Sequence, residues 1–198
     1  MKQVHGNSCI EVPQTDLPKN TEGDALFTTQ RGVWVGVRTA DCVPVLVWCA
    51  NNAGVAAVHA GWRGAVAGVT DSTIATFQRN GIALPQLRFA IGPAIAAESY
   101  EVDQQVHDAV RATGVTEAQW RTLAHPTDVA GKWQFDLVGY VRWRLLRAGV
   151  PTTAIQVFRA DVHRLPGTFH SHRLQTQQAL AGHPQPAGRQ WSAIALHA

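Results

Sequence analysis

The run Val43-Pro44-Val45-Leu46-Val47-Trp48, followed after a polar turn by Val55-Ala56-Ala57-Val58, decides the fold class of this chain. Both segments are short and rich in β-branched residues, which indicates β-strands. Residues 33–37 form a third run of this kind, and residues 25–29 form a fourth. Because apolar residues are nearly continuous in the first three runs, we expect both faces of these strands to be buried, as in a sheet covered by other layers.

Helices are predicted to follow these strands and to interrupt the later ones. Apolar spacing predicts a helix over residues 65–77, which ends at Asn80-Gly81. Residues 159–189 lack a clear period and are predicted to form a long loop with a short helix near residues 174–180. This pattern indicates an α+β or mixed α/β class, and the length favours a single domain over residues 1–198. The other expected elements are helices at about 102–112 and 135–148 and strands at 87–91, 155–158 and 191–196.

The composition excludes several kinds of partner. Basic residues outnumber acidic ones by only 17 to 14, without a run of consecutive Lys or Arg, so we expect no nucleic-acid binding. No segment offers the roughly 18 apolar residues of a membrane span, and the first residues lack the apolar region of a secretion signal. Three cysteines do not suggest a disulfide framework. We therefore expect a cytoplasmic protein that acts on a small neutral or anionic ligand, with monomer and homodimer both left open.

Cys42 and His59 lie seventeen positions apart, each at the end of a predicted strand. A thiolate and an imidazole suit zinc, although copper can outbind zinc at such a site. His5, in the motif Gln3-Val4-His5-Gly6, is a third candidate ligand. Three protein ligands leave one coordination position for water or substrate, and a bound metal lowers the pKa of that water. The alternative interpretation is a cysteine that packs as a small apolar residue beside a hydrogen-bonded core histidine.

Charged residues adjoin these candidate ligands. Asp41 directly precedes Cys42, and Arg63 lies in the Gly61-Trp62-Arg63-Gly64 turn after His59. An arginine at a strand-to-helix junction can bind an anion together with the helix N–H groups, so Arg63 is a candidate phosphate ligand. Stacking on Trp62 at the surface is the other interpretation. The segment Phe169-His170-Ser171-His172-Arg173 adds two histidines and an arginine, which is a weaker indication of metal binding.

Two further classes of function fit the same residues. In a metal-free hydrolase, Cys42 is the nucleophile, His59 its base and Asp41 the residue that orients the base. Thiol alkylation would then abolish the activity, whereas chelators would not. In a structural zinc or ligand-binding module, four protein ligands surround the metal and no open position remains.

Seven motifs occur in an order that resembles a known family. They are Gln3-Val4-His5-Gly6, Gly23-Asp24-Ala25-Leu26-Phe27-Thr28, Thr39-Ala40-Asp41-Cys42-Val43-Pro44, His59-Ala60-Gly61-Trp62-Arg63-Gly64, Ala90-Ile91-Gly92-Pro93-Ala94-Ile95, Ser99-Tyr100-Glu101-Val102 and Phe169-His170-Ser171-His172-Arg173. The chain resembles the YfiH-like family over nearly its whole length. Members of that family are described both as multicopper polyphenol oxidoreductases (laccase-like) and as zinc-dependent purine nucleoside phosphorylases.

The resemblance implies a four-layer α/β/β/α sandwich with mixed sheets, and a metal bound by His5, Cys42 and His59. It also implies phosphorolysis of adenosine, inosine and methylthioadenosine, with adenosine deaminase as a second activity. For these reactions we expect Asp41 and Arg63 to assist Cys42 and His59 in catalysis. We expect phosphate or ribose to be held by Arg63, His170 and Arg173.

Two features depart from the family pattern. Relatives carry a further stretch before the Gln-Val-His-Gly motif, which this sequence lacks. Many relatives also have a Cys-Thr pair where this chain has Arg159-Ala160-Asp161. The second departure weakens the transfer of any role for a second thiol.

Oxidation of phenols is the family's other description. A laccase needs one copper that takes electrons and a coupled cluster that reduces oxygen, so many histidines must converge. This chain has nine histidines, and only His170 and His172 form a closely spaced pair. One mononuclear site cannot complete the four-electron reduction of oxygen, so we rank this activity below nucleoside phosphorolysis.

Overall fold

The structure is a computed structural model and describes residues 1–13 and 17–197. Its strands are β1 (Cys9–Glu11), β2 (Ala25–Thr28), β3 (Trp34–Thr39), β4 (Val43–Cys49), β5 (Val55–Ala60), β6 (Leu87–Ile91), β7 (Glu101–Asp103), β8 (Ala124–Pro126), β9 (Lys132–Phe135), β10 (Ile155–Val157) and β11 (Gln190–Ala195). Its helices are α1 (Trp62–Ala67), α2 (Val69–Arg79), α3 (Gln104–Ala112), α4 (Glu117–Leu123), α5 (Leu137–Arg147) and α6 (His172–Leu180).

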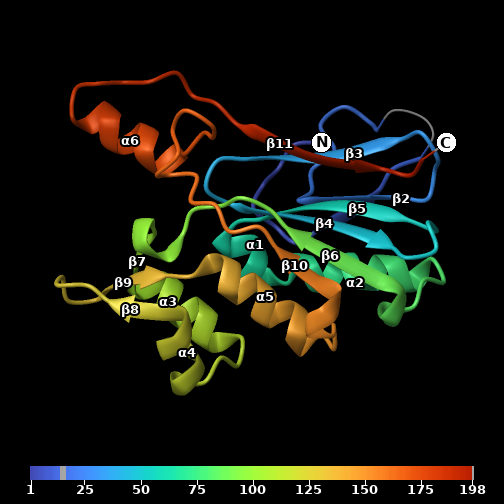
Figure 1. The fold of residues 1–198 in the computed structure, drawn as a ribbon, viewed down its shortest axis with the longest axis horizontal. Coiled ribbons are helices and arrows are strands. Elements are labelled where there is room, and N and C mark those ends of the chain that lie inside the picture. Colours follow the sequence, from blue (N-terminus) through green and yellow to red (C-terminus); the bar gives the residue numbers. More distant parts are fainter. Residues whose placement is uncertain (14–16, 198) are drawn as a thin grey trace.

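A six-stranded sheet in the order β1-β2-β5-β4-β6-β10 forms the centre of the molecule (Figure 1). Its outer pairs β1–β2 and β6–β10 are parallel, and the inner pairs are antiparallel. Helices α1, α2 and α5 cover one face, and an antiparallel pair formed by β3 and β11 covers the other. The prediction of a mixed α/β fold with mixed sheets is therefore confirmed.

Strand β5 shows why the central runs lack polar residues. Each of its six residues is buried, because successive side chains point to opposite covered faces. Ala56 and Val58 pack into the core between the sheet and the helices, together with Phe77. Val55 and Ala57 pack into a second core between the two sheets. The expected burial of both faces is thus confirmed for β5.

Strand β3 departs from this expectation. Val35 and Val37 are buried between the sheets, whereas the Trp34 side of the strand faces outward and Trp34 is 73% exposed. Trp191 of β11, on the same pair of strands, is 69% exposed. The alternation was not evident in the predicted run 33–37 because its outward positions are Trp34 and Gly36, and the charged outward residue, Arg38, lies just beyond that run. The prediction that β3 is buried on both faces is therefore wrong.

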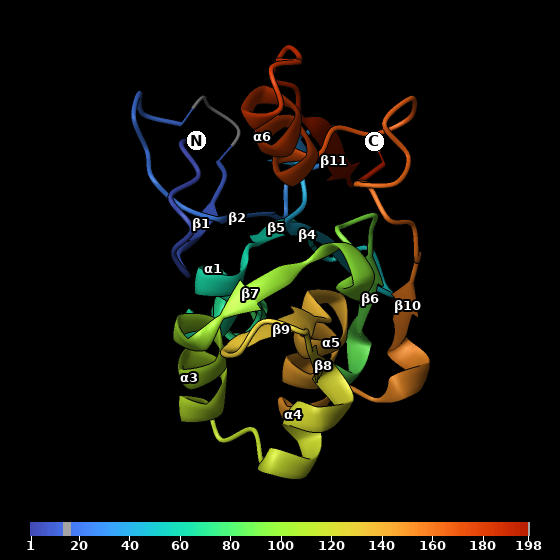
Figure 2. The same ribbon diagram turned by 90° about the vertical axis from the view of Figure 1, so that its left-hand side faces the viewer.

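A smaller unit packs beside the main sheet, at the side that faces the viewer in Figure 2. It contains the three-stranded sheet β7-β9-β8 and helices α3 and α4. The sequence pattern did not predict these three- and four-residue strands, which carry little periodicity, or the seven-residue helix α4. The helix expected from residue 102 begins at Gln104, because Asp103 caps it by accepting hydrogen bonds from Gln105 and Val106 N–H.

The helix expected over residues 65–77 is divided into two. Gly68, with φ of 90°, ends α1 in the left-handed conformation and begins α2. The long segment before β11 carries α6, close to the predicted position, at the end of the molecule where β11 begins (Figure 1). In the part of the chain that the structure describes, no helix is long and apolar enough to cross a membrane.

Candidate metal centre and substrate pocket

The sheet topology brings Cys42 and His59 together. Cys42 lies in the turn between β3 and β4, directly before β4, and His59 lies near the end of β5. Antiparallel pairing of these strands sets Pro44 opposite His59, so the start of one strand adjoins the end of the other. The short segment before β1 adds His5. Three distant parts of the sequence therefore meet at one corner of the sheet.

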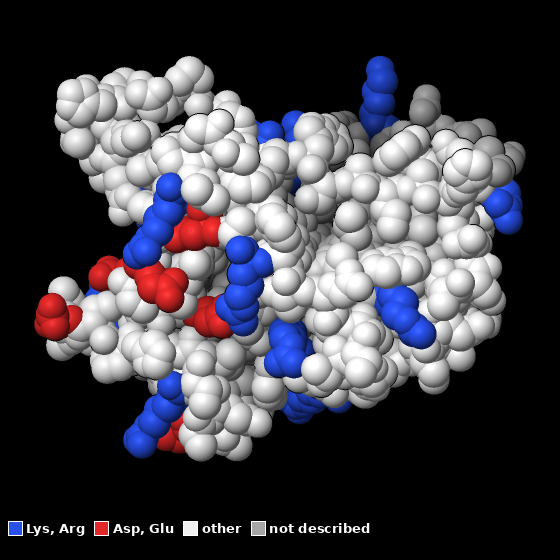
Figure 3. Space-filling model, viewed as in Figure 1, with Lys and Arg blue, Asp and Glu red and all other residues white. Residues whose placement is uncertain are grey.

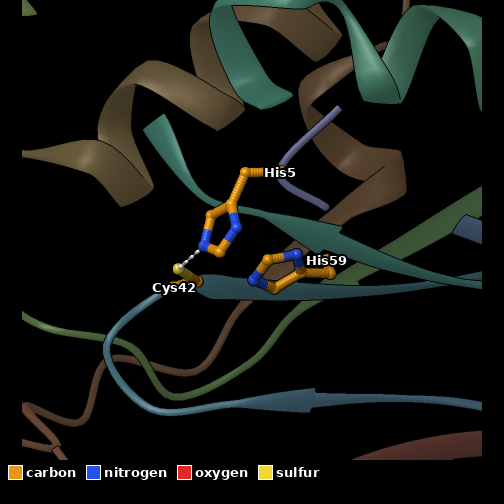
Figure 4. A group of neighbouring side chains, drawn as sticks. All are labelled: His5, Cys42 and His59. Carbon is orange, nitrogen blue, oxygen red and sulfur yellow. Dashed lines mark hydrogen bonds between the residues drawn. The ribbon is translucent and has the colours of Figure 1, made fainter. Parts of the chain in front are cut away.

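Figure 4 shows the side chains of His5, Cys42 and His59 pointing toward one another. Their ligand atoms all lie within 4.8 Å of one another, and Cys42 Sγ is 3.9 Å from His5 Nε2. The two imidazole rings meet edge to face, with their centroids 4.8 Å apart. A tetrahedral zinc with bonds of about 2.0 to 2.3 Å separates its ligands by roughly 3.3 to 3.8 Å. Small side-chain movements therefore suffice to close the three atoms around an ion.

Two glycines make room for this approach. A Cβ atom at Gly61 would lie 2.8 Å from His5 Cδ2 and 3.1 Å from Cys42 Sγ. A Cβ atom at Gly64 would lie 2.7 Å from the Gly6 carbonyl oxygen. The donor set of one sulfur and two ring nitrogens suits zinc or copper, and the glycines allow it to converge, so these residues fit a metal ion.

The electrostatic surroundings of Cys42 favour the thiolate, which is the form that binds a metal. Burial alone would raise the pKa of Cys42, but hydrogen bonding to His5 and His59, together with their charge, lowers it to about 7. Burial would lower the pKa of His59, whereas hydrogen bonds to Asp24 and Cys42 raise it to about 9. In the metal-free protein, the cysteine and His59 thus stabilise each other as an ion pair, which a metal cation would replace.

Asp24 is a site residue to which sequence analysis assigned no role. Its side chain is completely buried, and its Oδ1 lies 2.8 Å from His59 Nδ1. Burial tends to raise the pKa of Asp24, but hydrogen bonds from His59 and from the N–H groups of Gly6 and His5 lower it below its ordinary value. Asp24, rather than Asp41, therefore orients His59.

Asp41 interacts with α6 instead. Its carboxylate accepts hydrogen bonds from Ser171 Oγ at 2.5 Å and from Arg173 N–H at 2.6 Å. Asp41 also has a φ of 87°, a conformation that is unusual for a residue other than glycine. The turn that carries Cys42 is thus tied to the first residues of α6, which places Arg173 near the metal ligands.

A cavity of about 620 Å³ opens over the three ligands. Its wall carries four cationic side chains and, in Asp41, one carboxylate, so it favours an anionic ligand or co-substrate. Tyr100 forms part of the wall, with the guanidinium carbon of Arg173 lying 5.4 Å from the centre of its ring. The cationic residues are Lys2, Arg38, Arg173 and Arg189.

A second, smaller cavity of about 350 Å³ adjoins the first, because Tyr100 and Arg173 line both. It also contains Arg63 and Lys132. The guanidinium carbon of Arg63 lies 4.4 Å from the centre of the Trp62 ring. Arg63 therefore both stacks on Trp62 and lines the cavity. The structure therefore brings two of the three predicted phosphate ligands to one cavity.

His170, the third predicted phosphate ligand, lies elsewhere. It is exposed, its backbone N–H donates to Gln190 Oε1, and its ring packs against Gly188. His172, two residues later, lines the larger cavity instead. The sequence could not show which of the two histidines faces the larger cavity. In the structure it is His172.

The fold and the site together define a mixed α/β protein with a Cys/His cluster at the ends of adjacent strands. The family model described as multi-copper polyphenol oxidoreductase laccase matches residues 1–197. The chain belongs to this family, which confirms the YfiH-like resemblance.

Individual relatives agree with this assignment. A protein from Synechocystis named purine nucleoside phosphorylase is 34% identical, over 87% of this chain and 73% of its own length. A protein named purine nucleoside phosphorylase from Deinococcus radiodurans is 31% identical, over 99% of this chain and 69% of its own length. The crystal structure of YlmD from Geobacillus stearothermophilus matches with a TM-score of 0.86 and 31% identity, over 98% of this chain and 72% of that chain. YfiH from Bacillus licheniformis matches with a TM-score of 0.85 and 27% identity, over the same shares.

Proposed function

We propose that this protein is a metal-dependent purine nucleoside phosphorylase that acts on adenosine, inosine and methylthioadenosine, with adenosine deamination as a second activity. The observation that carries the proposal is the convergence of His5, Cys42 and His59 beneath a cation-lined cavity. The relatives named purine nucleoside phosphorylase support the reaction class.

Zinc is the proposed metal, held by Cys42 Sγ and by one imidazole nitrogen of each histidine. When bound, it supplies a Lewis acid and an open position for water or a substrate oxygen. His59 uses its Nδ1 for Asp24, so its Nε2 is the nitrogen left for the metal. This assignment fixes the orientation of the ring.

Phosphate binding is proposed for Arg63 and Arg173. Both residues line the same small cavity, where their guanidinium groups would bind oxygens of one phosphate through charge-assisted hydrogen bonds. In phosphorolysis, a phosphate oxygen forms a bond to C1′ of the ribose as the bond from C1′ to the purine nitrogen breaks. The products are ribose 1-phosphate and the free base, and the base takes up a proton. Tyr100, between the two cavities, is placed to contact both reactants.

The experiment is an assay of hypoxanthine release from inosine with zinc-loaded protein, with and without phosphate. We expect release that depends on phosphate and that is abolished in Cys42→Ala and in His59→Ala. Undiminished turnover in both variants would overturn the proposal. Release without phosphate would indicate hydrolysis instead.

Oxidation of phenols by a copper-loaded protein is the second candidate, favoured by the description of the matching family. The ligand set would also bind copper. Within residues 1–13 and 17–197, however, the three ligands form the only such cluster of metal-binding side chains, so a coupled copper cluster has no second ligand set there. Stoichiometric copper with rapid oxygen uptake on a phenol would favour this candidate over the first.

A further inference from the structure

A fully buried carboxylate normally needs a cationic partner or several hydrogen bonds, because burial removes the water that would stabilise its charge. Asp24 is 0% exposed, and its ion-pair partner is His59, whose Nδ1 lies 2.8 Å from Asp24 Oδ1. Every hydrogen bond that the structure gives this side chain leads to a metal ligand or to a residue beside one. Asp24 is therefore bonded only to the residues that carry the two imidazole ligands and to their neighbours.

Three of these bonds hold the segment that carries His5. Asp24 Oδ1 accepts a hydrogen bond from His5 N–H at 2.9 Å, and Oδ2 accepts bonds from Gly6 N–H at 2.7 Å and Val4 N–H at 3.3 Å. Successive N–H groups that surround an anion in this way form a nest. The carboxylate thus fixes the backbone of a segment that belongs to neither a helix nor a strand.

The backbone of His5 requires such support. Its φ of 60° lies in the left-handed region, which is unfavourable for a residue other than glycine and persists only where the surroundings hold it. The direction of the imidazole follows from this conformation. The Asp24 bonds are therefore the contacts that hold the His5 backbone in this conformation.

The fourth bond fixes the other imidazole. Asp24 Oδ1 lies 2.8 Å from His59 Nδ1, which determines the ring orientation and leaves Nε2 for the metal. Gly61 and Gly64 also lie close to the His5 segment, since a Cβ atom at Gly61 would be 2.8 Å from His5 Cδ2 and one at Gly64 would be 2.7 Å from the Gly6 carbonyl oxygen. The segment is therefore held by one carboxylate and approached closely by the start of α1.

We propose that Asp24 is the positioning residue that places both imidazole ligands before the metal arrives, so that metal affinity depends on a carboxylate that does not touch the metal. The inference rests on the metal site of the proposed function. It goes beyond that function because it states how the site is assembled in the metal-free protein and which residue assembles it.

The test compares zinc affinity in wild-type protein, Asp24→Asn and Asp161→Asn, measured by competition with a chromophoric chelator. Asp161 is a matched control, since its largely buried carboxylate also accepts backbone N–H bonds, from Ala96 and His163, away from the ligands. We expect Asp24→Asn to weaken zinc binding by roughly 10- to 100-fold, the loss typical of such outer partners. Asp161→Asn should stay within about twofold of wild type.

A second readout is the absorption spectrum of the cobalt-substituted protein. We expect Asp24→Asn to keep the cobalt–thiolate band and to change the ligand-field bands, because only the imidazole ligands are displaced. Equal zinc affinity in Asp24→Asn and wild type would overturn the inference. An equal loss in both variants would do the same, since it would show a general effect of removing a buried carboxylate. Failure of the wild-type protein to bind zinc would instead refute the metal site itself.

A measurement on the wild-type protein covers the case in which Asp24→Asn does not fold. Hydrogen exchange at the amides of His5 and Gly6 is followed with and without zinc. We expect both amides to be protected in the metal-free protein and to change little when zinc binds. Free exchange without zinc and protection only with zinc would show that the metal, rather than Asp24, orders the segment.

Discussion

Two cavities of nearly equal volume lie on different parts of this molecule, and their linings differ in charge. The cavity over the metal ligands, about 620 Å³, has four cationic side chains and one carboxylate in its wall. The other, about 610 Å³, lies between the β6–β10 edge and the smaller unit, and has three carboxylates and a single arginine, Arg159. The three carboxylates are those of Glu98, Asp136 and Asp161.

Charge is also unevenly distributed over the surface. On the face seen in Figure 3, the acidic side chains lie over the part of the molecule that contains β7 to β9, interspersed with basic ones, whereas the part over the main sheet shows isolated basic residues. In the second cavity, Asp161 is held by backbone N–H groups and Asp136 caps α5. These carboxylates thus stabilise local structure. Size alone does not distinguish the two cavities, but convergent metal donors and positive charge do.

The largest difference between the cavities should follow from removing a metal ligand. We expect His59→Ala to lower zinc affinity and phosphorolysis by more than the roughly 100-fold typical of losing an outer partner, because a direct ligand is lost. His125→Ala, in the second cavity, is the matched control and should leave both quantities within about twofold. Chelator competition and the inosine assay measure the effects. A comparable loss in His125→Ala would erase the distinction between the cavities.

A second comparison uses one arginine from each cavity. Arg173→Ala should raise the KM for phosphate by roughly 10- to 100-fold, since a hydrogen bond to a charged group contributes about 1.5 to 3 kcal/mol. Arg159→Ala removes an arginine that lies 3.8 Å from Asp136 and should leave this KM unchanged. Phosphate titration at saturating inosine measures both. If the two variants gave the same KM, phosphate would not bind through Arg173.

A third comparison tests the close approach of the ligands. Gly61→Ala introduces a Cβ atom only 2.8 Å from His5 Cδ2, so we expect zinc affinity to fall by about tenfold as the ligands separate. The control is Gly167→Ala, because a Cβ atom there meets nothing within 4 Å. Zinc affinity and thermal unfolding are measured together. Unchanged affinity in Gly61→Ala would mean that the ligands do not need this approach.

The smallest effect concerns the cysteines of the metal-free protein. The pKa of Cys42 is lowered to about 7, and the thiolate is the form that alkylates. We therefore expect the alkylation rate of Cys42 to rise with pH and to reach half of its maximum near pH 7. Burial raises the pKa of Cys9, so that residue should react slowly over the same range. Mass spectrometry after timed iodoacetamide treatment locates the label. A midpoint for Cys42 at the ordinary cysteine value would contradict the ion pair with His59.

Much of this arrangement could be predicted from the sequence, for identifiable reasons. The buried strands 43–49 and 55–60 are strong signals because both faces are covered. Cys42 and His59 stand at the ends of these strands, so their proximity follows from antiparallel pairing. The motif order also identified the family.

Other features could not be predicted, because they depend on long-range contacts. Asp24 resembles any acid before a strand until the fold brings the His5 segment and His59 against it. Asp41 adjoins Cys42 in sequence, yet its carboxylate faces α6, 130 residues later. His170 and His172 are equivalent in the sequence, and only the placement of α6 distinguishes them.

The proposed function depends on one sulfur and two imidazoles that hold a cation with an open position. An anomalous-scattering map at the zinc edge, from crystals of the zinc-loaded protein, locates that cation. We expect one strong peak bonded to Cys42 Sγ and to one nitrogen each of His5 and His59, with a non-protein fourth ligand. A peak bound by other residues, or by four protein ligands at this corner, would contradict it.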